Sequence, residues 1–229
     1  MLLLAVDTSG KNGSVALARA AAGRPEVEII EAVPLAGGTF SAQLIPQISA
    51  LLEKHGFGKK DLAALAAVSG PGSFTGLRVG LAAIKGLAEG LQKPIATVSL
   101  LEAVARSCSA RGRVLAALDA GRREVYVGDY EVSVGESSPP THMKGERFLS
   151  REEFLAEARG KSVVTPEASL AAALEAGGIA CEHISYPDIA VIARLGWERI
   201  QSGYTVAAQE LDANYIRRSD AEIFSQLKS

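Results

Sequence analysis

The sequence predicts an α/β protein with two lobes related by internal duplication. Strand patterns alternate with helix patterns along most of the 229 residues. The same pattern occurs twice, at residues 2–18 and again at 114–132: an apolar strand ends in an aspartate, and a polar turn and a second apolar strand follow. Asp7 and Asp119 hold the same place in the two copies, and the same order of elements follows each.

Composition indicates an ordinary globular protein, with 48% hydrophobic and 22% charged residues. The net charge of −2 gives no basic surface for nucleic acid, so a partner would have to supply most phosphate contacts. Cys108 and Cys181 are isolated, which favours a reducing compartment. No apolar run approaches the roughly 20 residues that span a bilayer, and the N-terminus lacks a charged leader. We expect a cytoplasmic protein without membrane contact.

The first copy opens with three strands. Residues 2–9 read as a buried strand, Asn12–Gly13 favours a hairpin, and residues 26–33 alternate charged and apolar side chains. Together they predict an antiparallel meander. The segment 41–55 then has helical spacing, with one apolar face formed by Leu44, Ile45, Ile48, Leu51 and Leu52.

The rest of the chain alternates strand and helix. In the first copy a strand, the loop SGPGSFTGLR (Ser69–Arg78), a helix, the strand PIATVS and a further helix follow. The second copy continues with a Ser- and Pro-rich loop (Ser133–Glu146), a helix from Ser150, and then two strands and two helices. We expect a first lobe at 1–104 and a smaller second lobe at 105–229, with the C-terminal segment a candidate for packing back on the first.

The loop SGPGSFTGLR has the order strand, glycine-rich turn, helix that often holds phosphate. A P-loop needs a lysine at the end of the turn, whereas here the nearest is Lys85, far inside the helix. The glycines form GxGxxxG rather than GxGxxG, and the next strand ends without an acid. The sequence therefore argues against a phosphate or dinucleotide loop.

The helix at 76–91 has only a narrow polar stripe, and its interior glycines would each cost about 1 kcal/mol relative to alanine. Such a cost makes sense where another backbone approaches closely. Either the helix is buried within its own lobe, or it keeps a glycine-lined face for a second chain. On the second interpretation we expect the partner to contact Leu44, Ile48, Leu51, Phe74, Gly76, Gly80, Ala83 and Leu87.

Two αβ lobes, each opening with a meander that carries an acid at the first strand end, are the plan of the actin-like ATPase (ribonuclease H-like) fold. Nucleotides bind between the lobes of that fold, although a fold does not fix a function. Asp7 has a simpler alternative role, which is to cap its turn. The candidate nucleotide or interface residues are Asp7, Thr8, Ser9, Asp119, Arg122 and Arg123.

The segments LLLAVDTS, SAQLIPQI, GPGSFTGLRVG, DAGRREVY and NYIRR, in this order, resemble the bacterial TsaB family, also called YeaZ. The chain is much shorter than TsaD, the larger paralogue that shares GPGSFTGLRVG. The resemblance implies an actin-like fold and a role in transferring a threonylcarbamoyl group to the adenosine next to the anticodon of tRNAs that read codons starting with A. In that family TsaD carries the transfer chemistry, with a metal held by a histidine pair.

The resemblance further implies a non-catalytic scaffold. It would bind TsaD through helices of its first lobe, be joined by the ATPase TsaE, form a homodimer when alone and meet tRNA only through the complex. The residues agree with this role, because His55, His142 and His183 lie far apart and form no HxxxH pair. We therefore expect no catalytic residue and no metal site. Arg217 and Arg218 are candidates for a tRNA or partner contact, with a solvated surface as the alternative.

Two segments depart from the family pattern. Many relatives read DAR where this chain has Asp119–Gly121, and many have a glycine-rich turn where it has Pro166–Ala168. Proline and glutamate suit a phosphate turn poorly, so we expect no firmly bound cofactor, with ATP or ADP confined to the interface with the partner. The alternative functions are a stand-alone ATPase or small-molecule kinase of the actin-like class, and a metallopeptidase.

Overall fold

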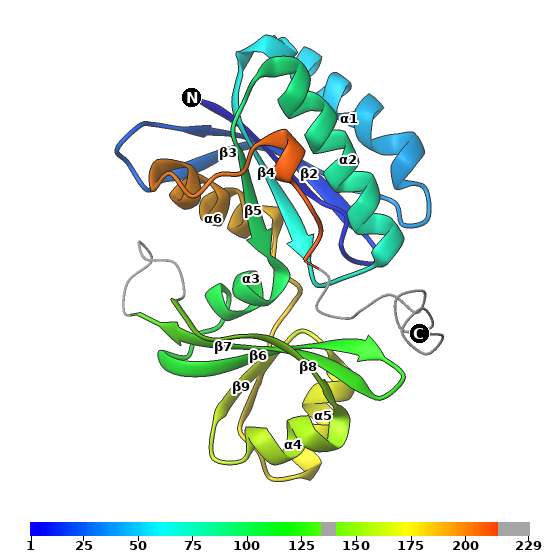
Figure 1. Ribbon diagram of the computed structural model, residues 1–229, viewed down its shortest axis with the longest axis vertical. Helices are drawn as coiled ribbons and strands as arrows, with labels where there is room; N and C mark the ends of the chain where they lie inside the picture. The colour runs from blue at the N-terminus through cyan, green and yellow to red at the C-terminus, as the bar shows by residue number, and fades with distance from the viewer. Residues whose placement is uncertain (134–140, 215–229) are drawn as a thin grey trace, which may run out of the picture.

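The computed structural model describes residues 1–133 and 141–214, with side chains at 1–133 and 145–214. Two five-stranded sheets form two lobes, one above the other in Figure 1. No helix of these residues is long and apolar enough to cross a membrane.

The first sheet has the strand order β3-β2-β1-β4-β5. Its first three strands pair antiparallel, β1 (Leu2–Asp7) with β2 (Gly13–Ala20) and β2 with β3 (Val27–Leu35), which confirms the predicted meander. β4 (Leu62–Gly70) runs parallel to β1, and β5 (Ile95–Ser99) runs parallel to β4.

The second sheet repeats this plan as β8-β7-β6-β9-β10. β6 (Gly112–Gly121) and β7 (Glu124–Val132) pair antiparallel, whereas β9 (Ser162–Thr165) and β10 (Cys181–His183) are parallel to their neighbours. The same order, with the same directions, confirms the internal duplication and the two-lobed ribonuclease H-like, actin-like fold.

One strand lies where the sequence predicts a loop. β8 (Thr141–Ser150) pairs antiparallel with β7 and overlaps the predicted loop Ser133–Glu146. The strand is at the sheet edge, and its register with β7 shifts on both sides of Asp129. Such shifts break the two-residue period of a strand, which is why the pattern does not show it.

Pairs of helices cover the outer side of each sheet. α1 (Phe40–Lys54) and α2 (Phe74–Leu91) lie side by side on the first sheet (Figure 1). α4 (Arg151–Ala158) and α5 (Ala168–Ala176) close the second sheet over a core that includes Phe154 and Leu174.

The last helix of each copy crosses to the other lobe. α3 (Leu100–Arg106) follows β5 but packs mainly on β6 and β7, and α6 (Ile189–Gln201) follows β10 but packs across β1 to β5. A Cβ on Gly196 would lie 2.4 Å from the Ala66 Cβ, so α6 approaches the first sheet very closely. One apolar core, which includes Leu101, Ile192 and Val114, therefore runs continuously between the two sheets.

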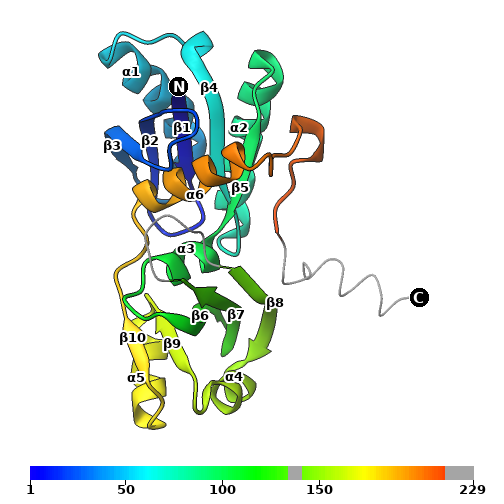
Figure 2. The ribbon, with the colours of Figure 1, turned by 90° about the vertical axis from the view of Figure 1, so that its left-hand side faces the viewer.

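The chain after α6 stays with the first lobe. Val206 N donates to Ile95 O at 2.9 Å, and the short helix η2 (Ala208–Glu210) contacts α2. Figure 2 shows this stretch beside α2. Asn214 then joins the lobes, because its backbone N donates to Ser69 O at 2.8 Å and its Nδ2 donates to Glu146 Oε2 on β8 at 2.7 Å.

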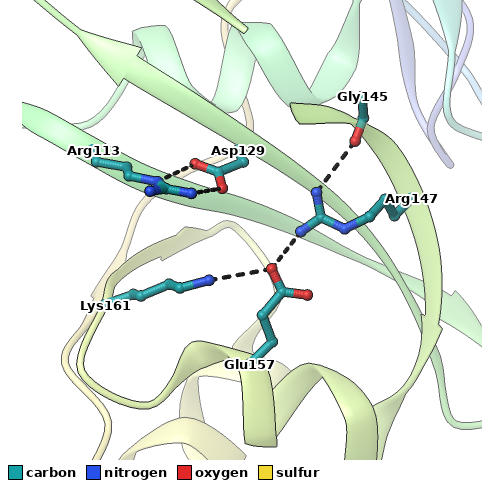
Figure 3. Close-up of polar contacts among 6 residues, drawn as sticks. All are labelled: Arg113, Asp129, Gly145, Arg147, Glu157 and Lys161. Carbon is teal, nitrogen blue, oxygen red and sulfur yellow. Dashed lines mark hydrogen bonds and ion pairs between the residues drawn. The ribbon is translucent and has the colours of Figure 1, made fainter. Parts of the chain in front are cut away.

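The second sheet carries a polar network beside α4 (Figure 3). Asp129 is fully buried and accepts two hydrogen bonds from Arg113, at 2.9 Å and 2.6 Å. These bonds hold the pKa of the Asp129 carboxyl below its usual value. Glu157 accepts from Arg147 at 2.5 Å and from Lys161 at 3.2 Å, so Arg147 ties β8 to α4.

Asp129→Asn should lower the free energy of unfolding at neutral pH. A carboxyl with a lowered pKa stabilises the folded state above its unfolded pKa and loses this effect as the pH falls through its folded pKa. The difference between wild type and variant should therefore shrink as the pH falls below the ordinary aspartate value of 3.8. Urea unfolding across a pH series measures it, with Glu175→Gln on the exposed side of α5 as the control, and a difference independent of pH would contradict the assignment.

Candidate functional site

A cleft of about 660 Å³ lies between the two lobes. The first lobe supplies the turn after β1, the start of α1 and the loop before α2. The second lobe supplies the ends of β6 and β9 and the segment before α6. The charged and aromatic residues that line the cleft are Lys11, Phe40, Asp119, Tyr126, Glu167 and Tyr186.

Asp7 and Asp119 make the same local contact in the two copies. Asp7 Oδ1 accepts a hydrogen bond from Ser9 N at 2.8 Å and another from Ser9 Oγ at 2.6 Å, and burial raises the pKa of Asp7. Asp119 Oδ1 accepts from Gly121 N at 2.7 Å. Each carboxylate thus closes the turn after its strand. For Asp7 this is the capping role that the sequence left as the alternative to a nucleotide site.

The loop SGPGSFTGLR supports that first turn. Ser73 N donates to Ser9 O at 2.7 Å, and a Cβ on Gly72 would lie 2.5 Å from the same oxygen. The Ser73 hydroxyl also accepts from Gly76 N at 3.3 Å and so caps α2. The loop therefore packs against the turn after β1 with its own backbone.

The glycines at the start of α2 continue this contact. A Cβ on Gly76 would lie 2.1 Å from Thr8 O, and a Cβ on Gly80 would lie 2.2 Å from Thr8 Oγ1. Thr8 is buried, and its hydroxyl donates to Gly76 O at 2.7 Å. These glycines thus permit a close approach between two segments of the same chain, which agrees with the interpretation that the helix is buried within its own lobe.

The predicted partner residues fall into two groups. Gly76 and Gly80 face Thr8, and three leucine or isoleucine side chains of α1 are buried in the core of the first lobe: Leu44, Ile48 and Leu51. Phe74 is 42% exposed, and Ala83 and Leu87 are partly exposed. The first group is used inside the chain, and Ala83 and Leu87 pack against the core of the first lobe, so Phe74 is the most exposed of the predicted partner residues.

The two arginines after Asp119 belong to the hairpin between β6 and β7. Arg122 and Arg123 both have positive φ angles, of 52° and 62°. Arg123 pairs with Glu152 on α4 at 2.5 Å, and neither arginine lines the cleft. Their predicted nucleotide or interface role stays a prediction. Arg217 and Arg218, the candidates for a tRNA or partner contact, lie outside the described residues.

Sequence reasoning missed Lys11 and Tyr186 in the cleft and considered Glu167 only as a poor residue for a phosphate turn. The Tyr186 hydroxyl donates to Glu167 Oε1, and burial raises the pKa of Tyr186. A signal for Glu167 was available, because it follows β9 and the carboxyl ends of parallel strands share one sheet edge. Nothing in the sequence pattern marks Lys11 or Tyr186, which lie in connecting segments.

The charge of the cleft is slightly negative. Among its lining residues in the described chain, Lys11 is opposed by Asp119 and Glu167. Within the same residues, no three His, Cys, Asp or Glu side chains come together as a metal site would require.

The two sheets of identical order, with a cleft between them, define a two-lobed protein of the actin-like, ribonuclease H-like class. A family model described as "TsaD: tRNA N6-adenosine threonylcarbamoyltransferase" matches residues 34–223. The chain therefore belongs to this family.

Individual relatives agree with the resemblance to TsaB. The tRNA threonylcarbamoyladenosine biosynthesis protein TsaB of Haemophilus influenzae is 29% identical over 227 residues, 95% of this chain and 94% of that protein. Bacillus subtilis TsaB is 34% identical over 140 residues, 59% and 57% of the two chains. The structure of YeaZ from Pseudomonas aeruginosa superposes with a TM-score of 0.74 at 26% identity and covers 93% of this chain and 99% of its own. These matches confirm the resemblance to TsaB, or YeaZ.

Gly80→Ala should lower the free energy of unfolding by about 2 kcal/mol, because its methyl group meets the Thr8 hydroxyl in a packed site. In a Thr8→Ala background the same substitution should cost much less, since the nearest Thr8 atom then left is Cβ at 3.4 Å. A double-mutant cycle by chemical denaturation measures this coupling. Equal costs in both backgrounds would contradict the contact.

Proposed function

We propose that this chain serves tRNA threonylcarbamoyladenosine synthesis as a subunit that pairs with TsaD and performs no transfer chemistry itself. The complex would transfer the threonylcarbamoyl group to the adenosine next to the anticodon of tRNAs that read codons starting with A. The observation that carries the proposal is the similarity, over 95% of the chain, to a protein named for this pathway.

The polar groups at the first strand end support a scaffold role. Thr8 Oγ1 is bonded to Gly76 O, and Asp7 Oδ1 accepts twice from Ser9. The Thr8 bond holds the turn after β1 against α2, and the Asp7 bonds close that turn. These hydrogen bonds stabilise the lobe, so we assign Thr8 and Asp7 a structural role.

The outer side of α1 and α2 supplies the partner surface. From the exposed small or apolar residues of the two helices we take six to define what we call the α1–α2 face: Ala42, Ile45, Ser49, Phe74, Ala82 and Gly86. Ile45 is 47% and Phe74 is 42% exposed, and the Arg78 guanidinium stacks on the Phe74 ring at 3.6 Å. Small residues let a second helix pair approach closely, and exposed apolar side chains gain from being covered.

The same face accounts for the other proposed partners. A second copy of this chain can cover it when TsaD is missing, which gives a homodimer. TsaE and tRNA would then join the assembled complex, and with a net charge of −2 the chain contributes little to phosphate binding by itself. We place this assembly in the cytoplasm, where tRNA is modified.

Gly86→Arg should weaken binding to the TsaD protein of the same organism at least tenfold, about 1.4 kcal/mol. A Cβ added at Gly86 meets nothing within 4 Å and Gly86 is exposed, so the variant should fold. Ala172→Arg on the exposed side of α5 is the matched control and should bind normally. Affinity can be measured by biolayer interferometry. Normal binding by Gly86→Arg would overturn the surface, and no binding by wild type would overturn the proposed function.

We also propose that the chain alone binds no nucleotide firmly, and that ATP or ADP is held only where TsaD completes the site. Asp119 and Glu167 would repel the phosphates that Lys11 attracts. Calorimetry of the purified chain with Mg–ATP should give no saturable binding at micromolar concentration. Such binding would instead favour the stand-alone ATPase or kinase.

A further inference from the structure

A second cavity, of about 520 Å³, lies where the two crossing helices meet the first sheet. Among the described residues, it shares no lining residue with the cleft between the lobes. Its walls come from the start of β3, the end of α3 with the segment after it, the end of β7 and one side of α6. The cavity is within the size range of small-molecule sites, and its charged lining residues are Glu26, Arg106, Arg111, Arg194 and Glu198.

Glu198 is the buried polar group of this cavity. Its side chain is only 10% exposed, and Oε1 lies 3.6 Å from Arg106 Nη2. Oε2 is buried and has no hydrogen-bond partner among the described residues. Burial also raises the pKa of Glu198. A buried carboxylate oxygen without a hydrogen-bond partner destabilises the folded state. A ligand in the cavity that donates a hydrogen bond to Oε2 would remove this penalty.

The three arginines that line the cavity attract a negatively charged group. Arg106, Arg111 and Arg194 approach the cavity from α3, from the segment after it and from α6. Arg111 is fixed in place, because its Nη1 donates to the carbonyl oxygens of Ser109 and Ala110 at 2.9 Å each. The planar fork of a guanidinium matches a carboxylate, and three of them beside two glutamates leave the cavity net positive.

We propose that this cavity binds a small zwitterion of the α-amino acid type. The carboxylate of the ligand would meet the arginines, and its ammonium group would donate to Glu198 Oε2. Inorganic phosphate fits less well, because it would satisfy the arginines but place its oxygens against the Glu198 carboxylate. This inference goes beyond the proposed function and does not depend on it.

The test is ligand-observed NMR on the full chain with each of the free amino acids in turn. At least one should bind with a Kd of about 1 mM or tighter. Glu198→Gln should weaken this binding at least tenfold, since it replaces the charged acceptor. Arg194→Ala should also weaken it, and because Arg194 is exposed, that variant should fold. Glu175→Gln on α5 is the matched control, and circular dichroism checks the fold of each variant.

Three results would overturn the proposal. The first is that no amino acid binds at about 10 mM, well above the expected Kd. The second is that inorganic phosphate binds as well as the best amino acid. The third is that binding is unchanged in a folded Arg194→Ala or Glu198→Gln variant, which would place the ligand elsewhere.

Discussion

The packing of α3 and α6 between the two sheets is the constraint on which the rest of the structure depends. Each helix leaves its own copy and covers the inner side of the other copy's sheet, so neither lobe can complete its core alone. Close packing of α6 requires small residues on both sides, which Gly196 and Ala66 provide. Because the shared core fixes the two sheets relative to each other, it also fixes the width of the cleft and forms the second cavity beside Arg106 and Glu198.

The second constraint is the contact between α2 and the turn after β1. Gly72, Gly76 and Gly80 bring the backbone of α2 and its loop against Ser9 and Thr8 with no room for a side chain. Glycines in a helix weaken it by about 1 kcal/mol each relative to alanine, so the contact must stabilise the folded state by more than this cost. Two hydrogen bonds contribute to this contact. Thr8 Oγ1 donates to Gly76 O, and Ser73 N donates to Ser9 O. One side of α2 is thereby used within the chain, and residues on its outward side, such as Ala82 and Gly86, stay exposed.

The sequence was sufficient for the fold because the duplicated pattern of strand, turn and strand is carried by short-range periodicity. It was not sufficient for β8, since an edge strand with register shifts beside Asp129 has no regular alternation. It also showed that the helix containing Gly80 must meet another backbone but could not show whose, because Thr8 lies 72 residues earlier in the chain. Tyr186 in the cleft, and Glu198 in the second cavity, depend on the crossing of α6 and the segment before it, which is a tertiary feature that no local pattern encodes.

The two copies differ in the surroundings of the aspartate that each carries at the end of its first strand. In the first copy, the turn after β1 is buried under α2, and Asp7 is used within it. In the second, Asp119 accepts from Gly121 N in the turn after β6 and stays exposed beside Glu167 in the cleft. The first lobe therefore contributes mainly backbone, hydroxyl groups and Lys11, whereas the second contributes the acidic groups. A ligand in this cleft would meet backbone and hydroxyl groups of the first lobe and the carboxylates of Asp119 and Glu167 on the second, where Arg151 Nη2 lies 3.9 Å from Asp119 Oδ2.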